Sequence, residues 1–336
     1  MFVDAALTTT DLHKVPDAAR AIEAAGYDGI YTFEGQHDAM FPLLLAAEHT
    51  ERVQLTTAVA IAFARNPMTL AQTAYDLQLA SHGRFRLGLG TQIKPHIEKR
   101  FSMPWSQPVD RMRELVLAIR AIWDTWHTGA PLKFEGEFYR HTLMTPFFNP
   151  GPSPYGLPAI FLAGVGPRMT EMAGEVADGF IVHPFGTEQS LRELTIPALE
   201  RGAVHGGRKL SDIEVAFPLM AVVADTDEQL ERGREAMRPR LAFYGSTPAY
   251  KVILDVHGWG DLQPELNRLS KAGDWATMSS LITDEMLEAF CVQGNPDEIG
   301  PIVRRRYGDL VQRVSFDTNT ALDPERAARV MAGIRA

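Results

Sequence analysis

The sequence predicts an α/β fold, a TIM-type (β/α)8 barrel with insertions. Short apolar segments rich in β-branched residues alternate with segments of helical spacing along the chain, which favours a parallel sheet. About eight such strand–helix units fit the chain, and eight units favour a closed barrel over an open doubly wound sheet. The length of 336 residues suits one barrel of about 250 residues with insertions.

The first four units precede residue 129. Cap-type residues at 8–11 come before the first helix and Gly26 closes it, while Pro67 suits the first turn of the third helix. Val53–Ala62 is apolar and β-branched, as in a strand that is buried on both faces. The predicted strands are Phe2–Ala6, Gly29–Phe33, Val53–Ala62 and Arg84–Gly90, and the predicted helices are Val15–Ala25, Pro42–His49, Met68–Leu79 and Arg111–Trp126.

Two stretches interrupt the alternation. Gly129–Pro158 holds six prolines and an alternating pattern, which predicts a hairpin plus a surface loop. Thr226–Arg313 is too long for one unit, which predicts extra helices. Residues 1–336 are therefore interpreted as a single barrel domain with an insertion near 129–158 and extra helices near 226–313. The remaining predicted strands are Ala159–Ala163, Gly179–Val182, Ile213–Ala224 and Val314–Phe316, and the remaining helices are Pro167–Val176, Glu188–His205, a tract from Asp227 and Pro324–Ile334.

Composition excludes several classes of protein. The chain has 33 Lys and Arg against 42 Asp and Glu, a net charge of −9, whereas nucleic-acid binders usually have the opposite balance. It has no apolar run of about 18 residues, so no membrane span is expected. Its first residues lack the basic start of a signal peptide. Cys291 is the only cysteine, which excludes disulfide scaffolds and cysteine–metal clusters. We expect a cytoplasmic protein that acts on a small molecule.

Familiar catalytic motifs are missing from the sequence. Gly88-Leu89-Gly90 and Gly164-Val165-Gly166 each follow a predicted strand, but Ile93 and Met169 occupy the third glycine position of a dinucleotide-binding fingerprint. The chain also has no phosphate-binding P-loop, no His-Glu-x-x-His zinc helix and no Gly-x-Ser-x-Gly elbow. The sequence therefore gives no support to a Rossmann NAD site, a kinase, a metalloprotease or a serine hydrolase of familiar type.

In a parallel barrel the reactive groups follow the carboxyl ends of the strands. Glu34-Gly35-Gln36-His37-Asp38 follows the second strand and could supply acid–base chemistry, with His37 favoured; the alternative is a solvated turn in which Asp38 caps the next helix. Arg65 and Asn66 follow the third strand and could hold an anion or a carbonyl group, and Asn66 could also cap the helix behind it.

Later strand ends offer further candidates. Lys94, Lys99 and Arg100 follow the fourth strand as a local basic patch, which suits an acidic ligand or a solvated loop. Ala163-Gly164-Val165-Gly166-Pro167-Arg168 follows the fifth strand, where small residues and a helix N-terminus favour an anion such as phosphate over a simple tight turn. His183 could face the pocket, but a structural histidine before a proline turn is the favoured interpretation, and the role of Asp317 is left open.

Four runs carry a family resemblance. Gly83–Gly90 resembles the GR-x-x-LGLG strand of the bacterial luciferase-like flavin and deazaflavin oxidoreductases, and Ala24–Gly29, Arg65–Pro67 and Gly166–Gly179 match the same superfamily in order. The resemblance covers Phe2 to about Arg335. The runs at 34–38 and 92–101 are similar to an actinobacterial-type group of F420-dependent oxidoreductases within it.

The resemblance implies a TIM-like barrel with a cofactor across its carboxyl end, coenzyme F420 or alternatively FMN. Relatives place an acidic residue and an adjacent histidine beside the reactive carbon, whereas here His37 comes three residues after Glu34, so Glu34, His37 and Asp38 all stay catalytic candidates. Relatives also back the ring with a bulge that often holds a non-prolyl cis peptide, matched here by residues 57–60. The candidate cofactor-binding residues are Thr57, Ala58, Val59, Arg65, Asn66, Gly90, Thr91, Gln92, Ala163, Gly164, Val165, Gly166 and Arg168.

The resemblance implies a hydride transfer between carbon 5 of F420 and an organic substrate bound near 129–158. His37, helped by Glu34, would move the accompanying proton, and Arg65 and Arg168 would hold anionic groups. Two alternatives stay open: an FMN-dependent monooxygenase and a non-catalytic flavin- or F420-binding protein. The oligomeric state is also open, although relatives are often homodimers.

Overall fold

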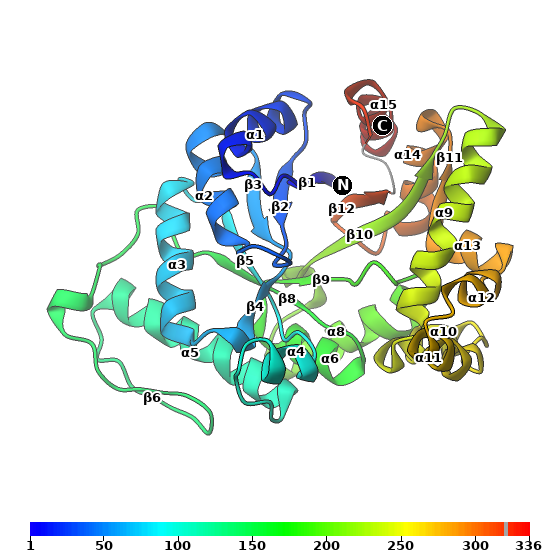
Figure 1. Ribbon diagram of the computed structural model, residues 1–336. Helices are drawn as coiled ribbons and strands as arrows, with labels where there is room; N and C mark the ends of the chain where they lie inside the picture. Colours follow the sequence, from blue (N-terminus) through cyan, green and yellow to red (C-terminus); the bar gives the residue numbers. More distant parts are fainter. Residues whose placement is uncertain (319–321) are drawn as a thin grey trace.

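The computed structural model describes residues 1–318 and 322–336 and contains a closed parallel barrel of eight strands (Figure 1), which confirms the predicted fold class. β1 pairs with β2 on one edge and with β12 on the other, and the pairing of β9 with β10 closes the ring. The barrel strands are β1 (Phe2–Ala6), β2 (Gly29–Thr32), β3 (Gln54–Thr57), β5 (Phe85–Gly90), β8 (Ala159–Ala163), β9 (Gly179–Ile181), β10 (Glu214–Val223) and β12 (Arg313–Thr318).

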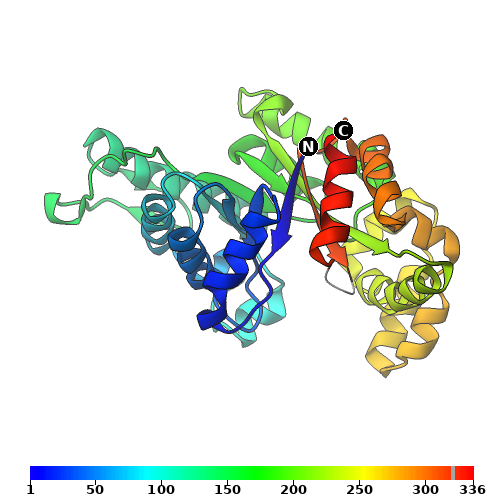
Figure 2. The ribbon, with the colours of Figure 1, turned by 90° about the horizontal axis from the view of Figure 1, so that it is seen from above.

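Helices cover the outside of the barrel, as Figure 2 shows from above. In α5 the predicted apolar stripe of Leu115, Ile119, Ile122 and Trp126 is at most 2% exposed, so this face packs against the barrel. No helix in the described part of the chain is long and apolar enough to cross a membrane. The covering helices are α1 (Val15–Ala24), α2 (Met40–His49), α3 (Pro67–Ala80), α5 (Pro108–Thr128), α6 (Pro167–Val176), α8 (Ile196–His205), α14 (Pro296–Tyr307) and α15 (Pro324–Arg335).

The third predicted strand is broken rather than continuous. β3 ends at Thr57, a cis peptide bond joins Ala58 to Val59, and a short strand β4 (Ala60–Ile61) then pairs with β5. The cis bond lies within the stretch 57–60 that the family resemblance indicates. The Thr57 hydroxyl donates to the Gly88 carbonyl oxygen (2.7 Å) and accepts from the Gly88 N–H (2.9 Å), so a side chain joins β3 to β5 where the backbone ladder stops.

Two segments extend beyond the barrel. Residues 129–158 form a projecting arm with an antiparallel pair, β6 (Phe134–Glu135) and β7 (Arg140–His141) (Figure 1). The Glu114 carboxylate of α5 accepts hydrogen bonds from the backbone N–H groups of residues 137, 138 and 139, which fixes this arm to the start of α5. The polar loop expected after β5 contains a short helix, α4 (Lys94–Lys99).

The segment between β10 and β12 holds helices and one strand that the sequence pattern did not predict, β11 (Cys291–Gly294). Met220 and Ala221 of β10 pair with β12 on one side and with β11 on the other. β11 therefore lies on the same side of β10 as β9, which pairs with the first residues of β10. These helices bury a second apolar core that includes Phe185, Leu241 and Leu287. They are α9 (Asp227–Gly245), α10 (Lys251–Val256), α11 (Leu262–Ala272), α12 (Trp275–Ser280) and α13 (Asp284–Phe290).

We predict that Gly88→Ala destabilises the protein, because an added Cβ would lie 1.8 Å from the carbonyl oxygen of Thr57, a backbone atom that cannot rotate away. The expected loss in the free energy of unfolding is about 2–4 kcal/mol. Urea unfolding followed by circular dichroism measures it. Gly35→Ala is the control, since its Cβ would meet the exposed Phe33 ring at 3.2 Å and that ring can move. Equal stability of the two variants would contradict the prediction.

Candidate active site

An ionic cluster joins the loops after β2 and β4. Arg65 donates from Nη1 to the Glu34 carboxylate and from Nη2 to the Asp38 carboxylate, both at 2.6 Å. Glu34 also accepts from the Ile61 N–H at 2.8 Å. The Glu34 and Arg65 side chains are only 8% and 17% exposed, so these contacts are sheltered from solvent. Arg65 thus fixes the strand-two loop to the segment after β4.

This placement differs from the predicted role of Arg65. Its guanidinium is bonded to two protein carboxylates, so it is not a vacant cation for an anionic ligand. The Asn66 side chain accepts from the Thr69 N–H at 2.9 Å and caps α3, which is the alternative interpretation given for that residue. Asp38 accepts from the Met40 N–H at 2.7 Å, which begins α2 two residues before the predicted start.

His37 lies in the strand-two loop between residues that are hydrogen-bonded to other segments of the chain. Its neighbours Glu34 and Asp38 are bonded to Arg65, and the Gly35 carbonyl oxygen accepts from Arg100 at 2.6 Å. The His37 side chain is exposed, and within residues 1–318 and 322–336 its imidazole makes no hydrogen bond or ion pair. Of the three catalytic candidates, His37 is therefore the one whose functional group is not already engaged by the protein.

The broken strand adjoins this loop. The Glu34 N–H donates to the Val59 carbonyl oxygen at 3.1 Å, and the Ala58 N–H donates to the Thr32 carbonyl oxygen at 2.6 Å. Gly90 packs so closely that an added Cβ would lie 2.7 Å from a Val59 methyl group. Thr57, Ala58, Val59 and Gly90 therefore lie together beside Glu34. Thr91 and Gln92 follow β5, where Gln92 has a φ of +60° and accepts the Thr91 hydroxyl proton at its carbonyl oxygen.

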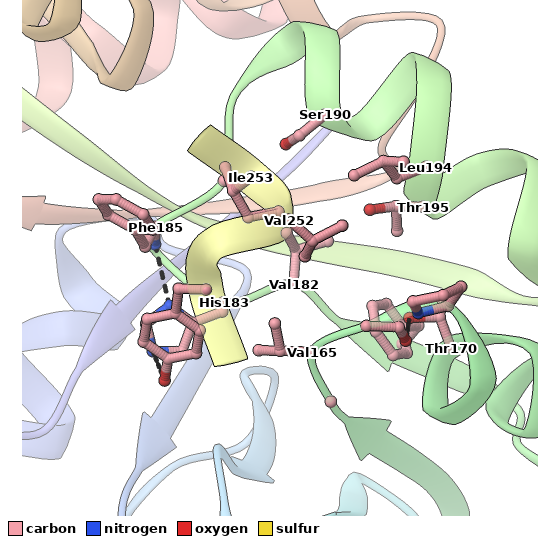
Figure 3. Close-up of a pocket in the computed structure, with 16 residues that line it drawn as sticks. Val165, Thr170, Val182, His183, Phe185, Ser190, Leu194, Thr195, Val252 and Ile253 are labelled. Atoms are coloured by element: carbon pink, nitrogen blue, oxygen red, sulfur yellow. Dashed lines mark hydrogen bonds between the residues drawn. The ribbon is translucent and has the colours of Figure 1, made fainter. Parts of the chain in front are cut away.

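A cavity that is partly open to solvent lies at the start of α6 (Figure 3). After Ala163, which ends β8, Gly164, Val165 and Gly166 line it. Gly166 has a φ of +90°, and no atom lies within 4 Å of the Cβ that another residue would place there. In the first turn of α6, Pro167 has no N–H and the Thr170 N–H donates to the Gly166 carbonyl oxygen at 3.2 Å, while Arg168 and Met169, whose N–H groups have no helical acceptor, are not among the residues that line the cavity. No Lys or Arg lines the cavity, and Arg168 is exposed outside it.

Two further cavity residues were not identified as ligand contacts from the sequence. His183 follows β9 and lines the cavity, although it was interpreted as structural; burial lowers its pKa to about 4. Tyr250 comes from the segment before α10, and no local signal marked it. The position of His183 at a strand end was the one signal that could have found it. Asp317, left open above, forms an ion pair with Arg240 at 2.6 Å, and burial raises its pKa.

The chain is similar in sequence to proteins of several organisms. An uncharacterized protein of Mycobacterium tuberculosis is 54% identical over 303 residues, which are 90% of this chain and 89% of that protein. An F420-dependent glucose-6-phosphate dehydrogenase of Nakamurella multipartita is 30% identical over 228 residues, which are 64% of this chain and 65% of that enzyme.

Solved structures share the fold across different chemistries. The coenzyme F420 dependent tetrahydromethanopterin reductase from Methanopyrus kandleri superposes with a TM-score of 0.78 at 21% identity, covering 98% of this chain and 96% of that one. The EDTA monooxygenase from Chelativorans sp. BNC1 gives a TM-score of 0.76 at 14% identity, covering 100% and 93%. At these identities the similarity shows the fold alone.

The sequence model of the luciferase-like monooxygenase family matches residues 2–313. This range includes all barrel strands from β1 to β10 and the first residue of β12. The protein therefore belongs to the luciferase-like monooxygenase family.

Proposed function

We propose that this protein is an F420-dependent oxidoreductase that transfers a hydride between the deazaflavin and a small organic substrate. The observation that carries the proposal is the position of the strand-two loop and the α6 cavity at the carboxyl ends of strands of one parallel barrel. His37, which can exchange a proton, and the α6 cavity, which can anchor a cofactor, thus lie at the same end of the barrel. The sequence relation to an F420-dependent dehydrogenase supports F420 as the cofactor.

The residues of the cavity fit the phosphate-bearing side chain of such a cofactor. Gly166 leaves open space where a side chain would otherwise stand, and the N-terminus of α6, the positive end of the helix dipole, lies at the cavity. Gly164, Val165 and Thr170 complete this wall. Arg168, exposed in the first turn of α6, is available for an anionic group beyond the cavity.

The protein residues have separate tasks in this proposal. When bound, F420 supplies a carbon centre that accepts or donates a hydride. His37 moves the accompanying proton at an imidazole nitrogen, since histidine exchanges protons near neutral pH. Glu34 and Asp38 act through Arg65, which holds the loop that carries His37. Val59 and Gly90 form the wall beside that loop.

The second candidate function is an FMN-dependent monooxygenase, favoured by the description of the family itself. FMN also has a phosphate-bearing chain, so the α6 cavity suits it as well. A non-catalytic binding protein is the third candidate, in which His37 would have no role beyond the surface.

We expect purified protein to bind F420 with micromolar or better affinity and to bind FMN more weakly, because the sequence relation favours the deazaflavin. Fluorescence titration with each cofactor in both oxidation states measures this. Oxygen uptake with reduced FMN is recorded in parallel. FMN binding without F420 binding, together with oxygen uptake, would replace the proposal by the monooxygenase.

We expect His37→Asn to lower kcat by about a hundredfold or more with substrates that a screen of alcohols and carbonyl compounds identifies on the wild type, because proton transfer contributes about 10²–10⁴ in rate. F420 affinity should change little. His127→Asn, which alters an exposed imidazole at the end of α5, is the control. Unchanged turnover in His37→Asn would assign the proton transfer to another group.

We expect Arg65→Ala to lower the free energy of unfolding by about 2–4 kcal/mol, because it leaves the sheltered Glu34 carboxylate without its cation. Arg20→Ala removes an exposed pair with Asp17 and should cost under about 0.5 kcal/mol. Chemical unfolding of both variants tests the difference. Similar small losses would mean that the Arg65 cluster does not stabilise the rim.

A further inference from the structure

Tyr250 and His183, the latter labelled in Figure 3, are two of the residues that line the α6 cavity and form a hydrogen-bonded pair. The Tyr250 hydroxyl oxygen lies 3.0 Å from His183 Nε2. The two rings also pack together, with centroids 4.5 Å apart. Nothing in the proposed function uses either residue, so the pair raises the question of what its polar groups face.

The backbone determines which nitrogen of His183 holds the proton. The Phe185 N–H lies 3.0 Å from His183 Nδ1, and a backbone N–H can only donate. Nδ1 is therefore an acceptor and has no proton. His183 is neutral at physiological pH, since burial lowers its pKa to about 4. The single ring proton then resides on Nε2, which donates to the Tyr250 oxygen.

Because His183 Nε2 donates to the Tyr250 oxygen, the Tyr250 hydroxyl proton has no acceptor on His183. Within the part of the chain that the structure describes, the Tyr250 oxygen has no hydrogen-bond contact other than His183. Burial raises the pKa of Tyr250 to about 12, so the hydroxyl keeps its proton. Because the tyrosine lines the cavity, its donor is available to a ligand there.

The other lining groups restrict the chemistry of that ligand. Val165, Val182, Val252 and Ile253 supply apolar walls, and the cavity has no Lys or Arg. Its polar groups are neutral hydroxyls and one imidazole, those of Thr170, Ser190, Thr195, Tyr250 and His183. A short chain that ends in an oxygen-rich group suits this combination.

We propose that Tyr250 donates a hydrogen bond to a phosphate oxygen of the cofactor side chain in this cavity, and that His183 is the positioning residue that directs the donor. The inference rests on the proposed function for the presence of a phosphate-bearing cofactor. It adds a contact from the segment between β10 and β12, which lies outside the strand-end loops.

The test compares F420 with the ribityl deazaflavin chromophore that lacks the phosphate and its tail. In Tyr250→Phe the dissociation constant for F420 should rise about tenfold to a hundredfold, as for a lost hydrogen bond to a charged group, while that for the chromophore should stay within about twofold. Tyr244→Phe is the matched control: its ring also packs on His183, with centroids 5.0 Å apart, but Tyr244 does not line the cavity.

His183→Ala separates positioning from general support of the fold. In the otherwise wild-type protein, His183→Ala should reduce the ratio of the dissociation constant for the chromophore to that for F420, which measures the preference for F420. In the Tyr250→Phe variant the same substitution should reduce this ratio no further. Thermal unfolding of each variant reports folding separately. A mainly structural role for His183 would weaken both ligands together and leave the preference unchanged, which would overturn its assignment.

The remaining outcomes also decide the inference. Equal weakening of F420 and the chromophore in Tyr250→Phe, or no weakening of either, would overturn the phosphate contact. If the wild type binds FMN in place of F420, the proposed function fails, and FMN with riboflavin provides the same comparison for Tyr250. A wild type that binds neither pair of ligands would overturn both.

Discussion

An ion-pair network inside the barrel links its strands at the end opposite to the candidate site. Arg313 of β12 pairs with Asp4 of β1 and with Glu214 of β10 (2.7 Å to the latter), and Glu214 also pairs with Arg86 of β5 at 2.6 Å. The Asp4 carboxyl is so deeply buried that its pKa is raised to about 6 despite Arg313. Buried ion pairs offset a large desolvation cost only with good geometry, so a strand that slipped by one residue would leave a charge unpaired. The network thereby fixes the register of β1, β5, β10 and β12, on which the positions of their ends at the rim depend.

At the rim, charged side chains mainly hold loops in place. Glu34, Asp38 and Arg65 neutralise one another in part, and Asp317 is paired with Arg240. The Arg65 pairs join the strand-two loop to the segment after β4, and the Arg240–Asp317 pair joins α9 to β12. The backbone on either side of His37 is therefore fixed, although the His37 side chain makes no hydrogen bond of its own within the described part of the chain. A fixed backbone keeps a reactive side chain close to its working position.

The fold could be predicted largely from local patterns, whereas the site could be predicted only in part. Most barrel strands lie in apolar, β-branched stretches of the sequence, and the apolar spacing of α5 indicates its buried face, so local periodicity was sufficient there. β11 was missed because Cys291–Gly294 directly follows α13, with no turn residue between the two elements. The local motif correctly suggested that Asn66 caps α3, yet it could not show that Arg65 binds carboxylates 27 and 31 residues away. Tyr250 reaches the cavity through the long segment after β10, and tertiary packing of that kind leaves no local signal.

The absence of cations from the lining of the α6 cavity, all of which lies in the described part of the chain, determines how an anion could be held there. A lysine or arginine would supply long-range attraction, whereas N–H dipoles and hydroxyl groups act only at contact distance. The chain as a whole has a net charge of −9, which adds no general attraction for a second anion. Recognition in this cavity must therefore depend on a few donors at fixed positions. Further anionic groups of a ligand would be better placed outside, toward the exposed Arg168, than within these neutral walls.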